Sequence, residues 1–465
     1  MKKTITLFAL TLVCMTTMAQ TTAEKLSTAY QQVAFNMFGE MTKAEDGNLC
    51  FSPLSAQIAL SMLQNGAAGN TLTQMQQAFG TDGFSLEEMN QYNQSVIQQL
   101  TNRPEFHYYE NGWQSLEEQQ KQFDAMYPKC EIANALWNRP DVQVLPSFTD
   151  CLKAYYDAEI APVVFSSQEG VDYMNGWVDE KTHGLIPSIY NEPLSPDVAL
   201  LLVNALYFKA AWAVPFWKEL TKQDKFYLSD GTVTQTEMMT TGSTVFDVTE
   251  TGAFRCVTMP YANNFCMTVF VPKEGYELPA FSLENWKNAV DAYRIYLYSK
   301  SIKTVGVNLK FPKLDFGGQY NLVPMFKTLG WTDFTDFSNQ CNPSKFVSAA
   351  FQVDKIKVDE EGTEAAAVTV IEMTESIEEP PSKIIDFFVD RPFYFTIENI
   401  STNTILFMGK VMNPGTGQSG NPTSIADIPA PQPDNSPIYD LSGRQLKQIP
   451  AHGIYIQNGK KYFRR

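Results

Sequence analysis

Hydrolytic chemistry of the Ser–His or Cys–His kind needs a histidine as its base, and this chain of 465 residues contains only three. They are His107, His183 and His452. His183 precedes Gly184 and Pro187, which predicts that it lies at the C-terminal end of a helix. Nucleophile elbows, paired zinc-binding histidines and phosphate-binding loops have recognisable patterns, and the sequence contains none of them. We therefore predict that the protein is not an enzyme; the alternative, a secreted hydrolase, would need His183 as its base.

A long segment begins at Gly362 and reaches Arg391 without the turn residues or strong apolar run of a packed element. Loops longer than about 12–15 residues are uncommon inside compact domains and are usually functional or disordered. The first half is small, neutral and free of proline, so every backbone amide there could join a β-sheet. The second half, Glu378–Lys383, has the composition of a solvated coil. The segment therefore predicts an exposed loop whose first half can become a buried strand.

Alternate side chains of a strand share one face, and the inward face here would hold only small residues. These residues are Thr363, Ala365, Ala367 and Thr369. Small side chains can enter a packed interior that large ones would overpack. We expect Gly362 to act as the hinge, because glycine adopts backbone angles closed to other residues. The alternative is a short helix, favoured by Glu364–Ala367 but disfavoured by the β-branched run Val368–Ile371.

Four motifs, in the same order along the chain, resemble the serpin family and together cover roughly residues 24–414. The hinge motif is Glu360-Glu361-Gly362-Thr363-Glu364-Ala365-Ala366-Ala367. The C-terminal motif is Phe388–Phe395, followed by Leu406–Val411 and Asn413-Pro414. Asn48–Ser55 resembles the family's junction of a strand and a helix, and Leu202–Trp212 resembles its central strand.

The resemblance implies a mixed α/β fold with three β-sheets, about nine helices and an exposed reactive-centre loop. In serpins the central five-stranded sheet accepts the loop as a sixth strand. A protease that cuts the loop becomes acylated on it, and the loop inserts before deacylation, which drags the protease across the molecule and distorts its active site. The resemblance thus implies a suicide-substrate inhibitor of serine or cysteine endopeptidases, driven by stored conformational energy. A non-inhibitory binding or carrier protein of the same fold is the alternative.

Three groups of site residues follow from matching the motifs. The hinge comprises Glu360, Gly362, Thr363, Ala365, Ala366 and Ala367. The shutter, a hydrogen-bonded cluster beneath the opening strands, comprises Ser52, Ser55, Asn204 and Gln352. The breach, where the loop first enters the sheet, comprises Trp212, Lys313 and Glu360, with an expected Glu360–Lys313 pair.

Two of these assignments have particular features. Gln352 stands where many serpins have histidine, although its amide can both donate and accept hydrogen bonds. Ser52 and Ser55 have a plain alternative role as capping residues before a helix at Ala56–Gln64.

The family convention places the cut bond fourteen residues beyond the hinge glycine, between Ser376 and Ile377. Alternative registers place it near Met373, Thr374 or Glu375. Between Gly362 and Pro381 the sequence has no arginine or lysine, which disfavours trypsin-like targets. Elastase-, chymotrypsin- or subtilisin-like proteases are the expected partners.

Composition limits the other partners. The net charge of −16 argues against binding nucleic acid or heparin, because a surface that binds polyanions needs a concentration of Lys and Arg side chains. The six cysteines after the leader are irregularly spaced without a Cys-x-x-Cys pair, so we expect buried free thiols and no structural metal. We expect no cofactor, and we expect a monomer.

The two ends of the chain differ from its middle. Residues 1–19 read as a signal peptide, with Lys2-Lys3, an apolar run Ile5–Val13 and cleavage after Ala19, and no later run is long enough to span a membrane. We expect a serpin domain at 24–414, a Pro/Gly-rich linker at 415–437 and a short β tail at 438–465. The tail resembles the C-terminal sorting signals of Bacteroidetes in shortened form; the alternative is a small β appendage. These features predict a secreted or cell-surface protein.

Between these ends the apolar periodicity predicts a mixed order of helices and strands. An amphipathic helix is expected at Ala23–Glu40. Strands are expected at Ala199–Phe208, Arg255–Pro260, Met267–Pro272 and Val305–Phe311. The polar, aromatic-rich region Thr101–Lys129 is left open as either a helical excursion or a loop.

Overall fold

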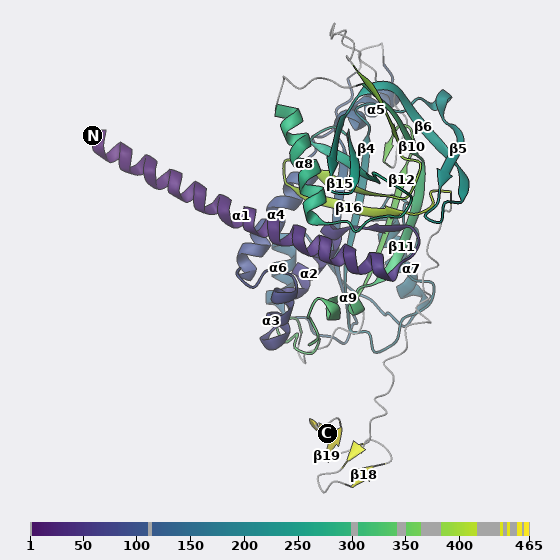
Figure 1. Ribbon diagram of the computed structural model, residues 1–465. Helices are drawn as coiled ribbons and strands as arrows, with labels where there is room; N and C mark the ends of the chain where they lie inside the picture. The colour runs from purple at the N-terminus through teal and green to yellow at the C-terminus, as the bar shows by residue number, and fades with distance from the viewer. Residues whose placement is uncertain are drawn as a thin grey trace. The chain divides into compact units, whose positions relative to one another are not determined.

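The computed structural model describes residues 2–109, 114–298, 306–341, 350–363, 383–415, 438–439, 444–446, 453–457 and 460–464. The chain divides into two compact units, Met1–Pro422 and Thr423–Arg465, which we describe separately. The first unit combines helices and three β-sheets (Figure 1). The second is a four-stranded sheet in the order β18-β17-β19-β20, formed by Gln445–Leu446, Ile438–Tyr439, Gly453–Gln457 and Lys460–Arg464.

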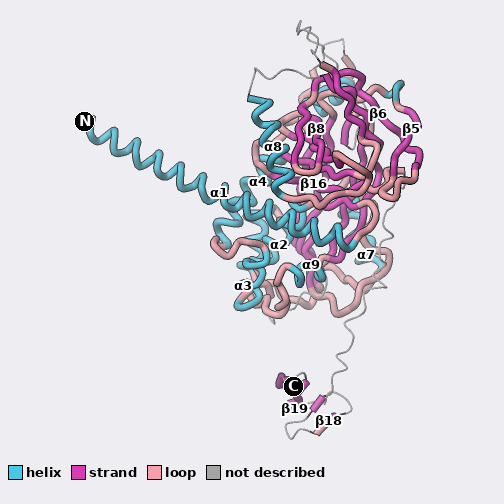
Figure 2. Tube along the Cα trace, in the orientation of Figure 1, coloured by secondary structure: helices cyan, strands magenta, loops and turns pink. Residues whose placement is uncertain are grey.

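Nine α-helices occur in the described part of the chain. They are α1 (Lys2–Ala44), α2 (Pro53–Gln64), α3 (Gly69–Ala78), α4 (Leu86–Thr101), α5 (Leu116–Met126), α6 (Pro146–Tyr156), α7 (Gln168–Lys181), α8 (Leu283–Tyr298) and α9 (Val323–Thr328). Helices α1 and α8 pack against the sheet that contains β7, β8 and β16 (Figure 2). Helix α2 contacts both β4 and β16, so it lies between two of the sheets.

The central sheet has the order β11-β12-β13-β4-β2-β3. Its strands are β11 (Leu314–Asn321), β12 (Phe351–Val358), β13 (Gly362–Thr363), β4 (Leu200–Ala211), β2 (Lys129–Asn138) and β3 (Glu159–Pro162). Strand β4 pairs with β2 over ten consecutive residues, from Leu200–Asn138 to Lys209–Lys129. Strand β12 pairs along its whole length with β11.

Two further sheets complete the first unit. One has the order β1-β16-β15-β9-β8-β7, formed by Leu49–Phe51, Thr404–Val411, Phe393–Asn399, Phe265–Pro272, Phe254–Pro260 and Asp247–Thr251. The other has the order β14-β10-β6-β5, formed by Ile384–Phe388, Gly306–Pro312, Val233–Val245 and Lys222–Tyr227.

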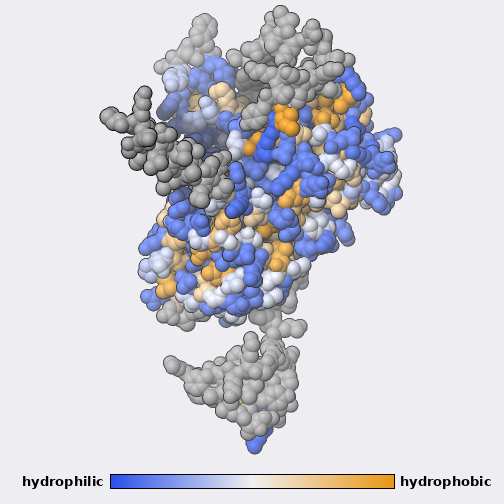
Figure 3. Space-filling view, turned by 60° about the vertical axis from the view of Figure 1, so that its left-hand side comes forward, coloured by the Kyte–Doolittle hydropathy of each residue, from blue (hydrophilic) through white to orange (hydrophobic). Residues whose placement is uncertain are grey.

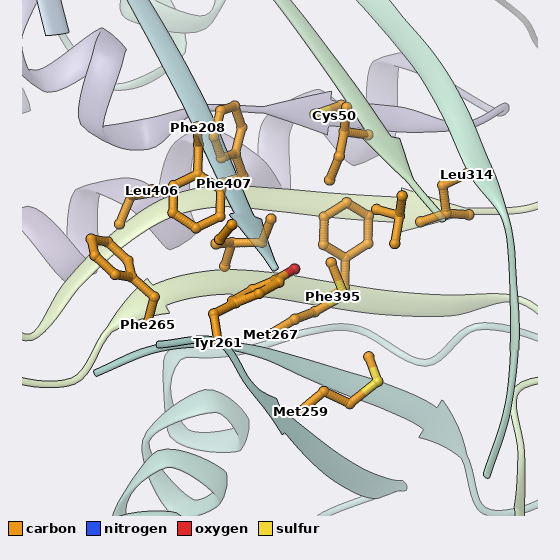
Figure 4. Packing of buried hydrophobic residues seen from close by; sticks show 14 of the residues in the cluster. Cys50, Phe208, Met259, Tyr261, Phe265, Met267, Leu314, Phe395, Leu406 and Phe407 are labelled. Atoms are coloured by element: carbon orange, nitrogen blue, oxygen red, sulfur yellow. The ribbon is translucent and has the colours of Figure 1, made fainter. Parts of the chain in front are cut away.

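The main core lies between the central sheet and the six-stranded sheet that contains β9 and β16. Phe208 of β4 packs on Tyr261 and Phe265, with ring centroids 5.6 Å and 5.2 Å apart (Figure 4). Leu406 and Phe395 from the C-terminal strands fill the same cluster. The burial of such large side chains supplies most of the favourable free energy of folding. On the face shown in Figure 3 the surface is mostly hydrophilic, with separate hydrophobic areas.

The predicted mixed α/β fold with three sheets and about nine helices is confirmed. The four predicted strands correspond to β4, β8, β9 and β10, with ends that differ by at most three residues. The helix predicted at Ala23–Glu40 forms part of the longer helix α1, and the region Thr101–Lys129 contains helix α5. In the portion of the chain that the structure describes, the helices are all too short or too polar to cross a membrane.

Candidate functional site: the loop hinge in the central sheet

The two-residue strand β13 is the start of the predicted loop, and it already occupies a place inside the central sheet. Gly362 pairs with Ala211 and Thr363 with Ala210 on one side, while Thr363 pairs with Val358 on the other. Both pairings are antiparallel. Among the residues that the structure describes, β4 and β12 are joined only through β13. The hinge therefore lies between β4 and β12, which is the place where a further strand would have to enter the sheet.

A tight turn brings the chain from β12 back into the sheet. The Asp359 amide donates to the carbonyl of Gly362 (3.0 Å), and the Asp359 carboxylate accepts from the amide of Glu361 (2.9 Å). The carbonyl oxygens of Glu360 and Glu361 accept from the amides of Phe216 and Trp212, at 2.9 Å each. These bonds fix the turn to the chain that follows β4.

Gly362 is required in this position for a reason other than the one predicted. We expected backbone angles that only glycine adopts, but Gly362 is not among the residues with positive φ. A Cβ atom added there would instead lie 2.0 Å from the carbonyl oxygen of Ala210. The sequence-based reason was wrong: glycine is needed because the backbone of β4 approaches so closely.

Thr363 is the first loop side chain that is buried, with 3% of its surface exposed. Its hydroxyl lies 2.5 Å from the Tyr261 hydroxyl. Tyr261 stacks on Trp212, with ring centroids 4.3 Å apart, and the Trp212 indole N–H donates to the carbonyl of Asp359 (3.0 Å). The predicted breach residue Trp212 therefore contacts the hinge through both its backbone and its ring.

The expected pair between Glu360 and Lys313 is present, with Lys313 Nζ 3.0 Å from Glu360 Oε1. The Glu360 side chain is 7% exposed and that of Lys313 33%. Burial alone would raise the pKa of Glu360, but hydrogen bonds and the charge of Lys313 outweigh burial and bring this pKa below its usual value. The neighbouring Glu361 forms an ion pair with Lys218. Both glutamates of the turn are thus bound by lysines.

Replacing Lys313 with methionine is expected to loosen the hinge. The Glu360 carboxylate would remain buried without its cation, which we expect to cost about 1–2 kcal/mol of unfolding free energy because Lys313 is partly solvated. Hydrogen exchange at Asp359–Thr363 and urea unfolding would measure the effect.

The matched control is Lys355→Met, because Lys355 also makes an ion pair in this sheet. That pair, with Asp315 at 3.6 Å, is exposed on both sides, so its loss should cost less than about 1 kcal/mol. Equal exchange rates at the turn in the two variants would contradict a tether at Lys313.

The predicted shutter residues fall into two groups. In the first, Ser52 caps helix α2 by accepting from the Ser55 amide (3.1 Å), as the capping alternative predicted for Ser52. Ser55 itself is not a cap, because the helix begins at Pro53 rather than at Ala56. The Gln352 amide nitrogen donates to the carbonyl of Ser52 (2.8 Å) and to Asp354 Oδ2 (2.7 Å). Gln352 Oε1 is buried without a hydrogen-bond partner.

Asn204 belongs to the second group, on the other side of the hinge position. Its amide nitrogen donates to Asn134 Oδ1 (2.7 Å), and Asn134 donates to the carbonyl of Tyr156 (2.8 Å). Asn204 Oδ1 is also buried without a partner. Two unpaired amide oxygens therefore lie on the strands that flank the hinge, one on β4 and one on β12.

Asp354 is a polar group of this site that the sequence reasoning missed. It is 5% exposed and accepts from the Ser52 amide (3.1 Å) as well as from Gln352. Burial raises its pKa to about 7, although these two hydrogen bonds act in the opposite direction. The alternation of β12 held the signal, because Gln352, Asp354 and Ile356 must share one face.

Several predicted residues lie outside the described part of the chain. These are Ala365, Ala366 and Ala367 of the hinge, the bond Ser376–Ile377 and its alternatives Met373, Thr374 and Glu375. Their roles stay predictions.

His183 has a structural setting at the end of helix α7. It adopts φ 52°, which fits the predicted helix terminus. Its Nε2 lies 2.6 Å from Glu131 Oε2 and 2.9 Å from Lys129 Nζ, and its ring packs on Tyr207. These contacts tie the helix to strands β2 and β4.

None of the six cysteines that the structure describes is in a disulfide, and five of them are buried, as predicted. Cys151 is the exception, because it is only partly buried. Within the described residues, histidine, cysteine and carboxylate side chains form no cluster of three or more that could hold a metal ion.

Comparison with known proteins agrees with this geometry. A protein-family profile described as serpin (serine protease inhibitor) matches residues 28–414. Serine proteinase inhibitor 1 of Vaccinia virus is 28% identical over 386 residues, which cover 80% of this chain and 97% of that protein.

Two solved structures are also similar. The native state of the thermophilic serpin tengpin has 27% identity and a TM-score of 0.66, covering 84% of this chain and 94% of its own. Human thyroxine-binding globulin, in complex with thyroxine, has 27% identity and a TM-score of 0.66, covering 84% and 99%.

Proposed function

Because this chain belongs to the serpin family, we propose that it inhibits serine endopeptidases, or cysteine endopeptidases, as a suicide substrate. A protease would cut the loop that begins at Gly362 and become acylated on it. The protease would then be trapped when the loop enters the central sheet. The acyl bond would form on Ser376, with Ile377 as the first residue of the leaving segment. The protein then provides a cleavable bond and a sheet that opens, rather than catalytic groups.

The observation that supports this proposal most directly is the register of β13. Thr363 lies opposite Ala210, so continued pairing would place Ala365 opposite Phe208 and Ala367 opposite Leu206. Phe208 and Leu206 are buried. Opposed residues of paired strands point to the same face, so the alanines would face the core, where small side chains fit without overpacking.

The target class follows from the loop sequence. The absence of arginine and lysine from the segment between Gly362 and Pro381 favours elastase-, chymotrypsin- and subtilisin-like enzymes. We also propose that residues 1–19 direct export and that the tail at 438–465 directs sorting, so that the inhibitor acts outside the cell or on its surface.

The test is to mix the protein with an elastase, a chymotrypsin and a subtilisin at equal molar amounts. We expect an adduct that survives denaturing electrophoresis, and mass spectrometry of the released fragment should locate the cut. Complete cleavage of the loop without an adduct would reject inhibition.

A second candidate, a carrier of small ligands, is favoured by the similarity to thyroxine-binding globulin. A cavity bounded by Ser27, Tyr30, Gln57, Tyr92 and Asn403 has a volume of only about 20 Å³, which suffices for a single water molecule. That size does not suit a drug-sized ligand.

Cutting the loop separates the two candidates. The loop is cut by limited proteolysis with a protease that the protein does not trap. If the protein is inhibitory, this cut should raise its melting temperature, because the freed loop completes the central sheet. An unchanged melting temperature after confirmed cleavage would favour the carrier.

A further inference from the structure

We infer that Asp354 is a positioning residue whose ionisation controls how readily the central sheet opens to admit the loop. It acts through the cap of helix α2. The inference deepens the proposed function and rests on it, because opening of the sheet matters for inhibition only if the loop inserts. Asp354 lies on β12, one of the two strands that flank the hinge strand β13.

Asp354 stands at the place where the sheet has to open. Val358, Thr363 and Ala210 are paired across β12, β13 and β4, so the two flanking strands run in the same direction. Four residues back along each flanking strand, Asp354 on β12 and Leu206 on β4 therefore share one level. Both are buried, with 5% and 8% of their surfaces exposed. A strand that continued past Thr363 would hold them two strand spacings, or about 10 Å, apart.

Helix α2 contacts both flanking strands. Its cap holds β12, because the Ser52 amide donates to Asp354 Oδ2 (3.1 Å) and the Ser52 carbonyl accepts from the Gln352 amide nitrogen (2.8 Å). On its other side α2 packs against β4, where Leu54 belongs to the same buried cluster as Leu206. The contact with β12 is therefore polar and the contact with β4 apolar. When the two strands move apart, α2 cannot keep both, and ionisation of Asp354 alters the polar one.

The Asp354 carboxyl is shielded from water while the sheet is closed. Asp354 pairs with Gly318 of β11. A Cβ atom added at Gly318 would overlap the Tyr320 hydroxyl, so the Tyr320 side chain lies against this pair. Tyr320 is 9% exposed, and its hydroxyl accepts from the amide of Cys50 on β1 (3.3 Å). Opening of the sheet would bring water into this closed cluster.

Titratable groups from neighbouring elements lie around this carboxyl. Burial raises the pKa of the Cys50 thiol and of the Tyr320 phenol, and the charge of Asp354 acts in the same direction on both, so both groups stay neutral. Glu45, which follows α1, acts on Tyr320 through its charge. Lys355 points to the other side of the sheet, because side chains alternate along a strand. A change of charge near neutral pH in the described part of this cluster therefore comes from Asp354.

The sign of the pH effect follows from hydration. In the closed sheet, burial raises the pKa of Asp354 from 3.8 to about 7. Opening brings water to the carboxyl, so its pKa in the open sheet falls back toward 3.8. The open sheet therefore binds the proton less tightly than the closed one. Opening becomes easier as the pH rises from about 4 to about 7 and does not change further above that range.

The test uses the full chain, the variant Asp354→Asn and a protease that forms the adduct. The readout is the limiting rate constant of adduct formation at saturating protease, measured at pH 5 and pH 8. The ratio of the wild type to the variant at one pH removes the protease's own pH dependence. We expect this ratio to be about tenfold higher at pH 8 than at pH 5, the change that results if opening lowers the pKa of the carboxyl by about one.

The matched control is Asp315→Asn, which changes an exposed aspartate on the neighbouring strand β11. Its rate constants should follow those of the wild type at both pH values. A purely structural role of Asp354 would change the rate of Asp354→Asn by the same factor at pH 5 and pH 8. That result would overturn this inference and leave the proposed function intact. A wild-type protein that is cut without forming an adduct would reject both.

Discussion

Under the proposed mechanism, replacing Thr363 with arginine is expected to convert the protein from an inhibitor into a substrate of the target protease. Thr363 is 3% exposed and its hydroxyl contacts that of Tyr261, so an arginine could enter this place only by burying an unpaired charge. The hinge would leave the sheet, and the first step of loop insertion would become slow. Deacylation of the cut loop would then finish before the protease is displaced.

The measurement is the stoichiometry of inhibition together with the yield of adduct. Insertion and deacylation compete, so raising the insertion barrier by about 1.4 kcal/mol shifts their ratio tenfold. We expect a shift of at least that size, seen as loss of the adduct band and accumulation of cleaved protein. Thr363→Ser, which keeps the hydroxyl, should retain the adduct. An undiminished adduct yield with arginine would show that insertion does not begin at this residue.

The composition of the hinge carried enough information to predict a segment that can become a strand, whereas the inhibitory mechanism was implied by the family resemblance. Small, proline-free residues after Gly362 are compatible with a buried strand, and the structure places Gly362 and Thr363 inside the sheet. The Glu360–Lys313 pair was predicted from the family resemblance, and the structure forms it. Local composition was informative at the hinge because a strand that is to enter between two others can carry only small side chains on its inward face.

Tertiary contacts were harder to predict. The close approach of Ala210 to Gly362 depends on the packing of β4, and sequence alone gives no distance between strands. The separation of Gln352 from Asn204 has the same origin, because the hinge position lies between their strands. Asp354 was missed because charged residues are rarely buried, so a buried carboxylate is not expected from sequence alone.

The region Thr101–Lys129 shows a signal that was available and not used. Ser115 and Glu118 have the spacing of a capping box, and the structure forms both of its hydrogen bonds at the start of α5. Apolar periodicity identifies a helix by its buried face, and the aromatic residues near this capping box are exposed. A helix with exposed apolar residues does not meet that expectation.

The second large effect concerns Asp354, which should make the native protein less stable as the pH rises. Burial raises the pKa of this carboxyl from 3.8 to about 7. The folded protein therefore binds the proton more tightly than the unfolded chain does, and this stabilisation is complete below about pH 4. It is lost as the pH rises through about 7, and the difference corresponds to roughly 4 kcal/mol. Glu398, also with a pKa of about 7, and Asp247, with a pKa of about 6, act in the same direction.

Asp354→Asn removes the ionisation and keeps an oxygen that can accept from Ser52 and Gln352. We expect its melting temperature to exceed that of the wild type at pH 8 and to match it below about pH 4, because the wild-type carboxyl is then protonated in both the folded protein and the unfolded chain. Glu398 and Asp247 should leave a smaller pH dependence in the variant. The control Asp315→Asn changes an exposed aspartate on the neighbouring strand β11, so its pH profile should follow the wild type. If Asp354→Asn is destabilising at both pH values by the same amount, the carboxylate is ionised in the folded state and its hydrogen bonds to Ser52 and Gln352 outweigh its burial.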